Sequence, residues 1–354
     1  MFFAGSAVWH NRPVLDELRE RYPDAHIVGC STAGEICGTQ VDDDTLVAVA
    51  VHFESTRLHA AYAQICDLAC SSAVGARLAR EIPADGLVHA FVLAEGLHVN
   101  GSELAAGLRS GLPDCVAVTG GLAGDGDAFR RTSVYLDGRS DDGGVVLIGF
   151  YGDDLRVGYG SLGGWDSFGP DRLVTRAEGN KLYELDGRSA LGLYKEYLGP
   201  YAEGLPASGL LFPLSLRGEG DDPGVVRTIL AVNEEDGSLT FAGDIPNGRY
   251  VRLMKANVDR LIDGAHAAAS ASYQALNAGA PELAILISCV GRKLVLKQRV
   301  EEEAESVRRV LGNAAVLAGF YSYGEIAPFA KSVKCELHNQ TMTITSFSER
   351  KRCA

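Results

Sequence analysis

A short aromatic segment near the C-terminus carries residue types that could bind a small polar ligand. Tyr321, Tyr323 and Glu325 stand at alternate positions in 315–328, where an apolar run leads into a glycine-rich loop. Arg292 follows a second apolar run. An arginine fork binds a carboxylate, a glutamate binds an ammonium group, and tyrosine offers an aromatic face and a hydroxyl. Together these side chains predict a site for an amino acid or a similar zwitterion.

The same residues allow a structural interpretation, in which Arg292 and Glu325 pair with each other and lock the loop. Cys289 belongs to the predicted ligand-binding set, because it ends the apolar run that precedes Arg292. A neighbouring arginine lowers the pKa of a thiol, so a thiol-based enzyme that uses Cys289 is one alternative function. A packed thiol beside a structural arginine is the other interpretation. We predict no catalytic residue and expect that the protein is not an enzyme.

Familiar catalytic and metal-binding patterns are missing from the sequence. It contains no GxSxG nucleophile elbow, and the glycine-rich stretch 120–127 lacks the Gly-Lys-Ser/Thr ending of a phosphate loop. The eight cysteines include no CxxC pair, so we expect reduced thiols and no zinc site. Three adjacent aspartates, 42–44, precede a predicted strand. We interpret them as a soluble strand edge and not as a cation site.

Haem is the one cofactor that the histidines leave open. None of the eight histidines forms an HxH or HxxxH pair, but a single axial imidazole is enough to hold haem. His98 stands in a predicted strand-to-helix loop, and His338 precedes the last predicted strand. These two residues are the candidate axial ligands.

Charge and hydropathy exclude two classes of partner. The chain has 354 residues and a formal net charge of −13. Proteins that bind nucleic acid need a basic surface, and no dense stripe of Lys or Arg occurs here. The longest apolar run, 145–151, is far shorter than a membrane span. We therefore expect a cytoplasmic protein that binds neither nucleic acid nor membrane.

An internal repeat organises the chain. A predicted unit of strand, helix, strand, loop and strand occurs within 1–54, again within 87–150 and again within 283–347. Two parallel strands need a crossover connection, and the last strand of each unit can pair antiparallel. The pattern predicts an α/β fold with mixed sheets and repeated units. The segment 252–277 has the apolar spacing of one long helix.

The second strand of each unit ends in a similar loop. These loops are 32–35, 122–125 and 321–325, and each closes on a glycine followed by an acid. Ligands bind at the carboxyl ends of parallel strands in folds of this kind. Only the third loop carries tyrosines, so we place the ligand there. In the other two loops the glycine and the acid are expected mainly to build the turn.

Several ordered motifs resemble the FIST family of bacterial signal-input domains over nearly the whole chain. They are GCSTAGEI at 29–36, GGLAGD at 120–125, EGN at 178–180, YELDG at 183–187, SCVGR at 288–292 and GFYSYGEI at 319–326. The resemblance implies two domains, a FIST N-terminal domain at 1–170 and a FIST C-terminal domain at 171–354.

The resemblance also implies a function. It implies that the protein senses a small ligand, for which amino acids are the usual proposal. It also implies coupling to kinase or cyclic-di-nucleotide signalling. The chain shows no appended kinase, cyclase or methyl-accepting helix. We therefore expect a stand-alone sensor that signals through a partner such as a histidine kinase, a diguanylate cyclase or a phosphodiesterase. Some members resemble haem-binding nitric-oxide sensors, and this is the second alternative function.

Overall fold

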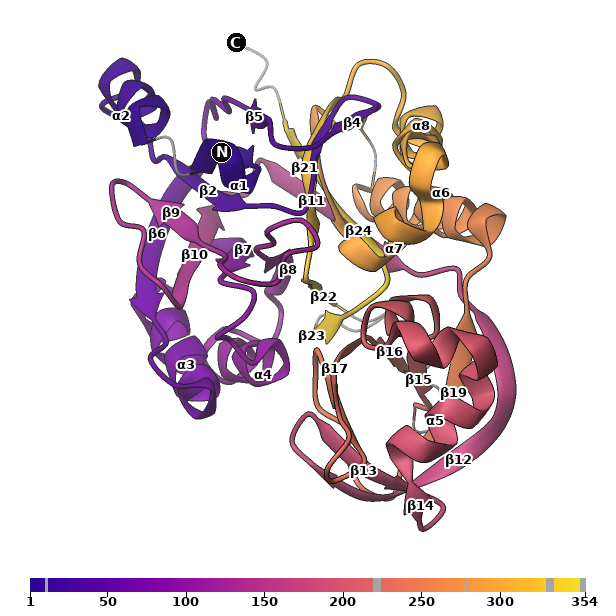
Figure 1. Cartoon of the computed structure of the whole chain (residues 1–354). Coiled ribbons are helices and arrows are strands. Elements are labelled where there is room, and N and C mark those ends of the chain that lie inside the picture. The colour runs from indigo at the N-terminus through magenta and orange to yellow at the C-terminus, as the bar shows by residue number, and fades with distance from the viewer. Residues whose placement is uncertain (10–11, 219–223, 278, 329–333, 351–354) are drawn as a thin grey trace.

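The protein has a body of three sheets, and one strongly curved sheet of eight strands lies beside it (Figure 1). The computed structural model describes residues 1–9, 12–218, 224–277, 279–328 and 334–350. It confirms an α/β fold with mixed sheets. No helix within these ranges has both the length and the apolar character that a membrane span requires.

Within the described residues, three sheets form the body. The first runs in the order β5 (Leu46–Ala48), β1 (Phe2–Ala4), β2 (Val28–Ser31) and β9 (Val134–Leu136). The second runs in the order β23 (Cys335–His338), β22 (Gly324–Pro328), β8 (Ala117–Leu122), β7 (Leu87–Ala94), β10 (Gly144–Tyr151) and β6 (Arg57–Gln64). The third runs in the order β11 (Leu155–Leu162), β24 (Met342–Glu349), β20 (Leu283–Cys289), β21 (Val316–Ser322), β3 (Glu35–Cys37) and β4 (Gln40–Asp42).

Each sheet of the body is centred on one parallel pair of strands. These pairs are β1–β2, β7–β8 and β20–β21. A later strand of the same unit, β5, β10 or β24, pairs antiparallel with the first strand of the pair. The predicted repeat of strand, helix, strand, loop and strand therefore occurs three times.

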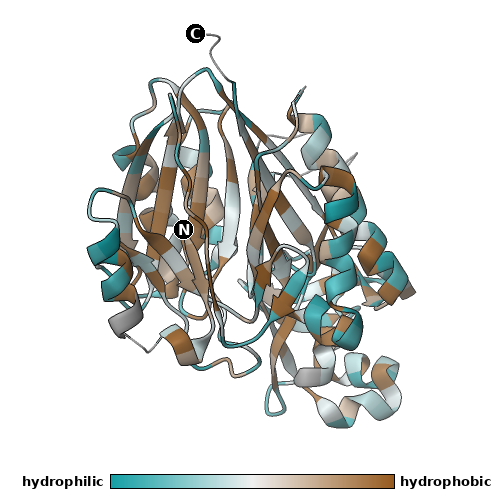
Figure 2. Cartoon of the chain, turned by 90° about the horizontal axis from the view of Figure 1, so that it is seen from above, coloured by the Kyte–Doolittle hydropathy of each residue, from teal (hydrophilic) through white to brown (hydrophobic). Residues whose placement is uncertain are grey.

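Helices provide the crossovers and cover the outer faces of the sheets. Those between parallel strands are α1 (Ser6–Trp9) with α2 (Arg12–Arg21), α4 (Gly101–Gly111), and α7 (Val290–Leu296) with α8 (Glu301–Leu311). Two further helices, α3 (Ser71–Glu81) and α6 (Val258–Ala275), pack beside α4 and α8. Short 3-10 turns lie at 68–70, 199–204, 207–211 and 297–299. Seen from above, apolar residues follow the strands and polar residues dominate the outer helices (Figure 2).

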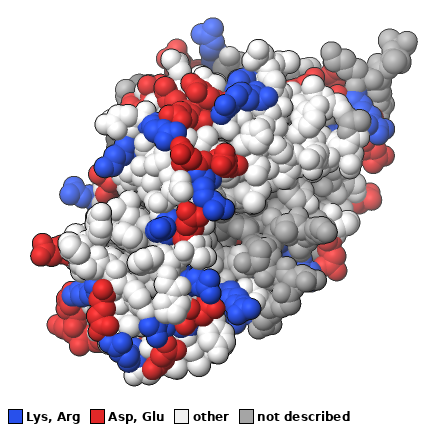
Figure 3. Space-filling model, turned by 90° about the vertical axis from the view of Figure 1, so that its right-hand side faces the viewer, with Lys and Arg blue, Asp and Glu red and all other residues white. Residues whose placement is uncertain are grey.

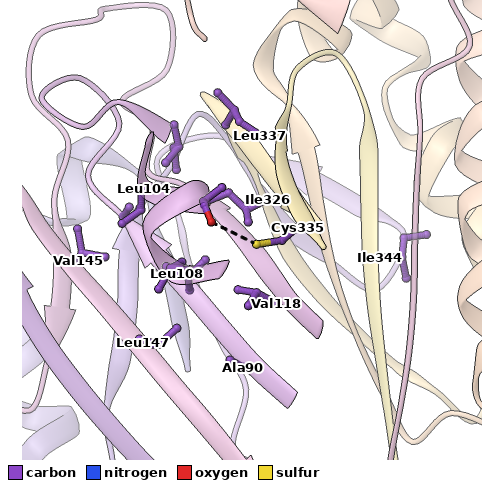
Figure 4. Close-up of a cluster of buried hydrophobic side chains, with 14 of the residues drawn as sticks. Ala90, Leu104, Leu108, Val118, Val145, Leu147, Ile326, Cys335, Leu337 and Ile344 are labelled. Atoms are coloured by element: carbon purple, nitrogen blue, oxygen red, sulfur yellow. Dashed lines mark hydrogen bonds between the residues drawn. The ribbon is translucent and has the colours of Figure 1, made fainter. Parts of the chain in front are cut away.

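The three units exchange strands in a ring. After its parallel pair, the first unit contributes β3 to the third sheet, where it pairs with β21. The second unit contributes β9 to the first sheet, beside β2, and the third contributes β22 to the second sheet, beside β8. Apolar side chains of α4, including Leu104 and Leu108, therefore pack against Ile326 and Leu337 of the exchanged hairpin (Figure 4).

The curved sheet wraps around one helix, α5 (Ala190–Leu198) (Figure 1). Its strands are β16 (Val225–Arg227), β15 (Leu214–Leu216), β19 (Tyr250–Lys255), β12 (Asp166–Glu178), β13 (Lys181–Leu185), β18 (Ser238–Phe241) and β17 (Ile229–Asn233), with β14 (Arg188–Ser189) beside β13. Leu191 and Tyr194 of α5 are buried against Phe241 and other apolar side chains of the sheet.

Two sequence-based boundaries can be compared with these elements. The long helix expected at 252–277 is wrong at its start, because 250–255 form β19 and pair with β12; α6 begins only at Val258. The proposed domain boundary between 170 and 171 falls inside β12.

Candidate functional site

The three strand-end loops meet at the centre of the body. The backbone NH of Ala33 donates to the carbonyl of Tyr321 at 2.8 Å, and the NH of Tyr321 donates to the carbonyl of Gly34 at 2.8 Å. The NH of Tyr323 donates to the carbonyl of Leu122 at 3.3 Å. The predicted site residues of the third loop therefore lie in an interior junction and not on an open rim.

Arg292 is fully buried and pairs with an acid that the prediction did not include. Its Nη2 and Nε donate to Oε2 of Glu303 at 2.7 and 3.1 Å, and Nη2 also donates to the carbonyl of Leu261 at 2.7 Å. The interpretation in which Arg292 pairs with Glu325 is therefore wrong. A buried charge is tolerated when it is paired and hydrogen-bonded in this way.

Tyr321 belongs to the same buried network. Its hydroxyl donates to Oε1 of Glu303 at 2.8 Å, and the hydroxyl of Ser288 donates to the same oxygen at 2.9 Å. Burial, together with the negative charge of Glu303, raises the pKa of Tyr321 well above its usual value. Glu303 thus joins Arg292 to Tyr321 and fixes the end of β21 against α8.

Glu325 is held by contacts that recur in the first unit. It accepts hydrogen bonds from Ser322 Oγ at 2.6 Å and from the backbone NH and hydroxyl of Thr341 at 3.1 and 2.9 Å. Glu35 accepts from the hydroxyl of Thr32, three residues earlier, and from the NH and hydroxyl of Thr45, both at 2.8 Å. This equivalence gives Glu325 a role in building the loop, as expected for its counterparts.

Burial dominates the ionisation of Glu325. It raises the pKa of the carboxyl to about 8, although hydrogen bonds from Ser322 and Thr341 and the charge of Arg292 act in the opposite direction. Burial also raises the pKa of Glu35.

Tyr323 points to the second loop. Its hydroxyl donates to Asp125, and its ring stacks on Phe129 with centroids 4.4 Å apart and planes at 12°. Burial and the Asp125 carboxylate raise the pKa of Tyr323. Asp125 also accepts from the backbone NH groups of Arg130 and Arg131, both at 2.8 Å. All five predicted residues thus lie close to one junction. In four of them, Arg292, Tyr321, Tyr323 and Glu325, the polar side-chain atoms form hydrogen bonds within the protein.

Cys289, the fifth, does not have the environment of a nucleophile. It is 2% exposed, and burial raises the pKa of its thiol, with the charge of Glu325 adding to this effect. Arg292 acts in the expected direction but is outweighed. A reactive cysteine requires a stabilised and accessible thiolate.

The two histidines considered for haem lie in different settings. His98 has a side chain that is 67% exposed, with Nδ1 3.4 Å from Oε1 of Glu95. His338 is buried, with Nε2 3.1 Å from the carbonyl of Ala327. Among the residues that the structure describes, no group of three or more His, Cys, Asp or Glu side chains is arranged to hold a metal ion.

A polar cavity lies where the body meets the curved sheet, and we call it the seam cavity. It has a volume of about 350 Å³. Its charged lining consists of Glu103, Arg109 and Glu336 from the body and Arg227, Asp244 and Arg249 from the curved sheet. Ser102 of α4 and Leu337 of β23 also line it. A cavity of about 490 Å³ beside β1 and β5 is lined mainly by apolar side chains, among them Phe2, Val28 and Phe150.

Arg227 is the unusual residue of the seam cavity. It is 6% exposed, and burial lowers its pKa to about 10. Its Nε donates to the carbonyl of Asp244 at 3.2 Å, and Nη1 donates to the carbonyl of Leu337 at 2.9 Å. Within the described part of the chain it forms no ion pair, and its Nη2 has no hydrogen-bond partner. Arg292, which is also buried, has a carboxylate partner.

Sequence reasoning missed Arg227, because it stands in an ordinary strand pattern, Val225-Val226-Arg227-Thr228. A charged residue in a short apolar strand was the available signal. It also missed Glu303, which belongs to an acidic run, 301–303, at the start of a helix. Such runs are common because they complement the helix dipole.

Comparison with known proteins finds a distant relative and a weak structural similarity. The chain is 25% identical over 284 residues to an uncharacterized protein of Methanocaldococcus jannaschii; the match covers 71% of this chain and 52% of that protein. The chain thus spans about half the length of this relative. A crystal structure of cyanuric acid hydrolase from A. caulinodans shares 12% identity, with 84% of this chain and 100% of that chain covered and a TM-score of 0.20.

Two family descriptions match the sequence in succession. The FIST N domain matches residues 1–188, and the FIST C domain matches residues 190–328. The first ends in β14, and the second begins at the first residue of α5. This chain belongs to the FIST family and carries its N and C domains in tandem.

Proposed function

We propose that this protein is a sensory module that binds a small, polar, amino-acid-like ligand and passes the signal to a separate partner. FIST domains are sensory domains of signalling proteins, which supports the general role. The observation that carries the ligand proposal is the seam cavity, whose lining brings three arginines and three acids together. Its volume of about 350 Å³ suits a small molecule.

The balance of charge in the cavity favours a zwitterion. A phosphate-rich ligand would need an excess of positive charge, and an apolar ligand would leave the buried guanidinium of Arg227 without a partner. We therefore place the ligand in the seam cavity and not at the set predicted from the sequence, which consists of Cys289, Arg292, Tyr321, Tyr323 and Glu325. The predicted set supports the loops that build the body.

The partner is proposed to be a histidine kinase or an enzyme that makes or degrades cyclic-di-GMP, and the place of action is the cytoplasm. Nucleic acid is not a proposed partner. On the face in Figure 3 basic side chains lie interspersed with acidic ones, which does not provide the continuous basic surface that a phosphate backbone requires. We propose no catalytic activity, and the buried position of the Cys289 thiol, which raises its pKa, supports that view.

Differential scanning fluorimetry with the twenty L-amino acids, each at millimolar concentration, tests the proposal. At least one should raise the midpoint of thermal unfolding, because a ligand that binds only the folded state stabilises it. Isothermal titration calorimetry then gives the affinity. Absence of any shift across the panel would refute an amino-acid-like ligand. A Soret band after incubation with haem would instead support the haem alternative, with His98→Ala and His338→Ala to locate the ligand.

A further inference from the structure

We infer that Arg227 is the anchor of the seam cavity and binds the carboxylate of a zwitterionic ligand whose ammonium group faces Asp244 and Glu336. This inference rests on the proposed function and names the site and the orientation of the ligand. Arg292 and Arg227 are the two most deeply buried arginines that the structure describes, and only Arg292 is paired with a carboxylate.

Arg292 and Arg227 differ in the groups to which they donate hydrogen bonds. Arg292 donates twice to Glu303, so its charge is compensated inside the protein. Arg227 donates only to main-chain carbonyls, those of Leu337, Asp244 and, at 3.5 Å, Val226. Carbonyl groups satisfy donors but do not neutralise a charge. The charges of Glu336 and Asp244 favour the ionised guanidinium, but neither carboxylate pairs with it directly and the effect of burial outweighs them. A buried charge is costly unless an opposite charge contacts it, and a ligand carboxylate supplies that contact.

The hydroxyl of Ser102 lies close to the guanidinium of Arg227. A methyl group added at Gly243 would lie 2.9 Å from Nε of Arg227 and 2.9 Å from Oγ of Ser102. Ser102 Oγ is buried and has no hydrogen-bond partner among the described residues. Ser102 and Arg227 come from different parts of the fold and line the same cavity. These distances place the two side chains close to each other beside Gly243. In the proposed complex the ligand carboxylate lies in the cavity, where it accepts from Nη2 of Arg227 and from the Ser102 hydroxyl.

Asp244 and Glu336 are the acids that would face the ammonium group of the ligand. Asp244 accepts from Asn100 Nδ2 at 3.1 Å through Oδ1. Glu336 lies 3.5 Å from Nη1 of Arg109, and its side chain is 42% exposed. These two acids line the cavity beside Arg227. Their charges attract an ammonium group and repel a second carboxylate on the ligand, so the site favours a monocarboxylate with a free amine over a dicarboxylate.

The experiment uses the full chain, with the best amino acid from the panel, its carboxamide and its N-acetyl derivative as probes. Blocking the carboxylate should weaken binding most, because Arg227 then loses its partner. Arg227→Met should weaken the unmodified amino acid about tenfold to a hundredfold, the range for a hydrogen bond to a charged group. The matched control is Arg217→Met, since Arg217 is exposed on the neighbouring strand edge and does not line the cavity.

A second variant covers the case in which Arg227→Met fails to fold. Asp244→Asn keeps an oxygen that can accept from Asn100 but removes the charge. It should weaken the unmodified amino acid and leave the N-acetyl derivative unaffected. If amino acids bind but neither variant changes their affinity, the site is wrong and the proposed function stands. If no amino acid binds the unmodified chain, the proposed function itself is wrong.

Discussion

Replacing Glu325 by glutamine should change how stability depends on pH. Burial raises the pKa of this carboxyl from its ordinary value of 4.5 to about 8 in the folded protein. Between these two values the folded state holds a proton that the unfolded state releases. Stability therefore falls as pH rises from 4.5 toward 8. The whole difference corresponds to roughly 5 kcal/mol at about 1.36 kcal/mol per pKa unit.

The glutamine can keep the contacts of the protonated carboxyl. Its oxygen can accept from the NH and hydroxyl of Thr341, and its amide can donate to Ser322 Oγ. The Ser322 hydroxyl then donates to the carbonyl of Ser288, which lies 3.3 Å away. We therefore expect Glu325→Gln to resemble the unmodified protein near pH 5 and to be more stable than it at pH 8.

Urea unfolding at pH 5, 6, 7 and 8, followed by tryptophan fluorescence, provides the measurement. The difference in free energy of unfolding between the two proteins should grow with pH by at most about 1.4 kcal/mol per pH unit. Other groups titrate as well: burial lowers the pKa of His89 to about 3, which removes stability as pH falls below 6.5. Subtracting one protein from the other cancels that contribution.

Glu349→Gln is the matched control. Burial raises the pKa of Glu349, but hydrogen bonds from Thr56, Ser55 and the NH of Glu54 outweigh it and lower the pKa to about 2. Its contribution is present above pH 4.5 and is lost as pH falls toward 2, outside the tested range. A Glu325→Gln curve that runs parallel to that of the unmodified protein from pH 5 to 8 would refute the reasoning.

Three other changes test the central junction. Arg292→Met should lower the free energy of unfolding by about 3–5 kcal/mol, because it leaves Glu303 charged and unpaired in the core; a loss under about 1 kcal/mol in urea, the level of a surface pair, would contradict this. Cys289 should resist iodoacetamide at neutral pH in the folded protein and react in urea, whereas the exposed Cys66 reacts in both; equal labelling of the two thiols in the folded protein, measured by mass spectrometry, would show that Cys289 is accessible. Tyr323→Phe should keep the stacked ring but cost about 1–3 kcal/mol through the lost hydroxyl contact, and an unchanged urea midpoint would argue that this contact contributes nothing.

Local patterns predicted the strands and helices that carry their own signal. β7 and β20 are examples, because each is a long apolar run that opens a predicted strand-helix-strand unit. β19 was hidden, since Tyr250–Lys255 leads directly into a helical pattern. Its strand conformation depends on pairing with β12, which is far away in sequence.

The candidate site depended even more on distant contacts. The sequence pattern predicted that Arg292 and Tyr321 lie at neighbouring strand ends. In the structure Glu303 joins them there, because it accepts hydrogen bonds from both. No local feature indicates that Glu303 is the partner of Arg292, or that Arg227 has no carboxylate paired with it in the folded protein. The partner of a side chain depends on the tertiary fold. Composition and spacing therefore indicated which residue types meet at the junction, but they did not indicate which side chains pair with each other.

The ring of exchanged strands has a consequence for how the chain is made. β3 and β11 belong to a sheet whose central strands, β20, β21 and β24, leave the ribosome long after them. Until then, β11 and the edge of β3 that faces β21 have no native strand to pair with, and unpaired strand edges favour aggregation. The third sheet can therefore be completed only after β24 has been made. A cut between the two family regions, at residue 189, would separate β3 from β21 and leave neither fragment with three complete sheets.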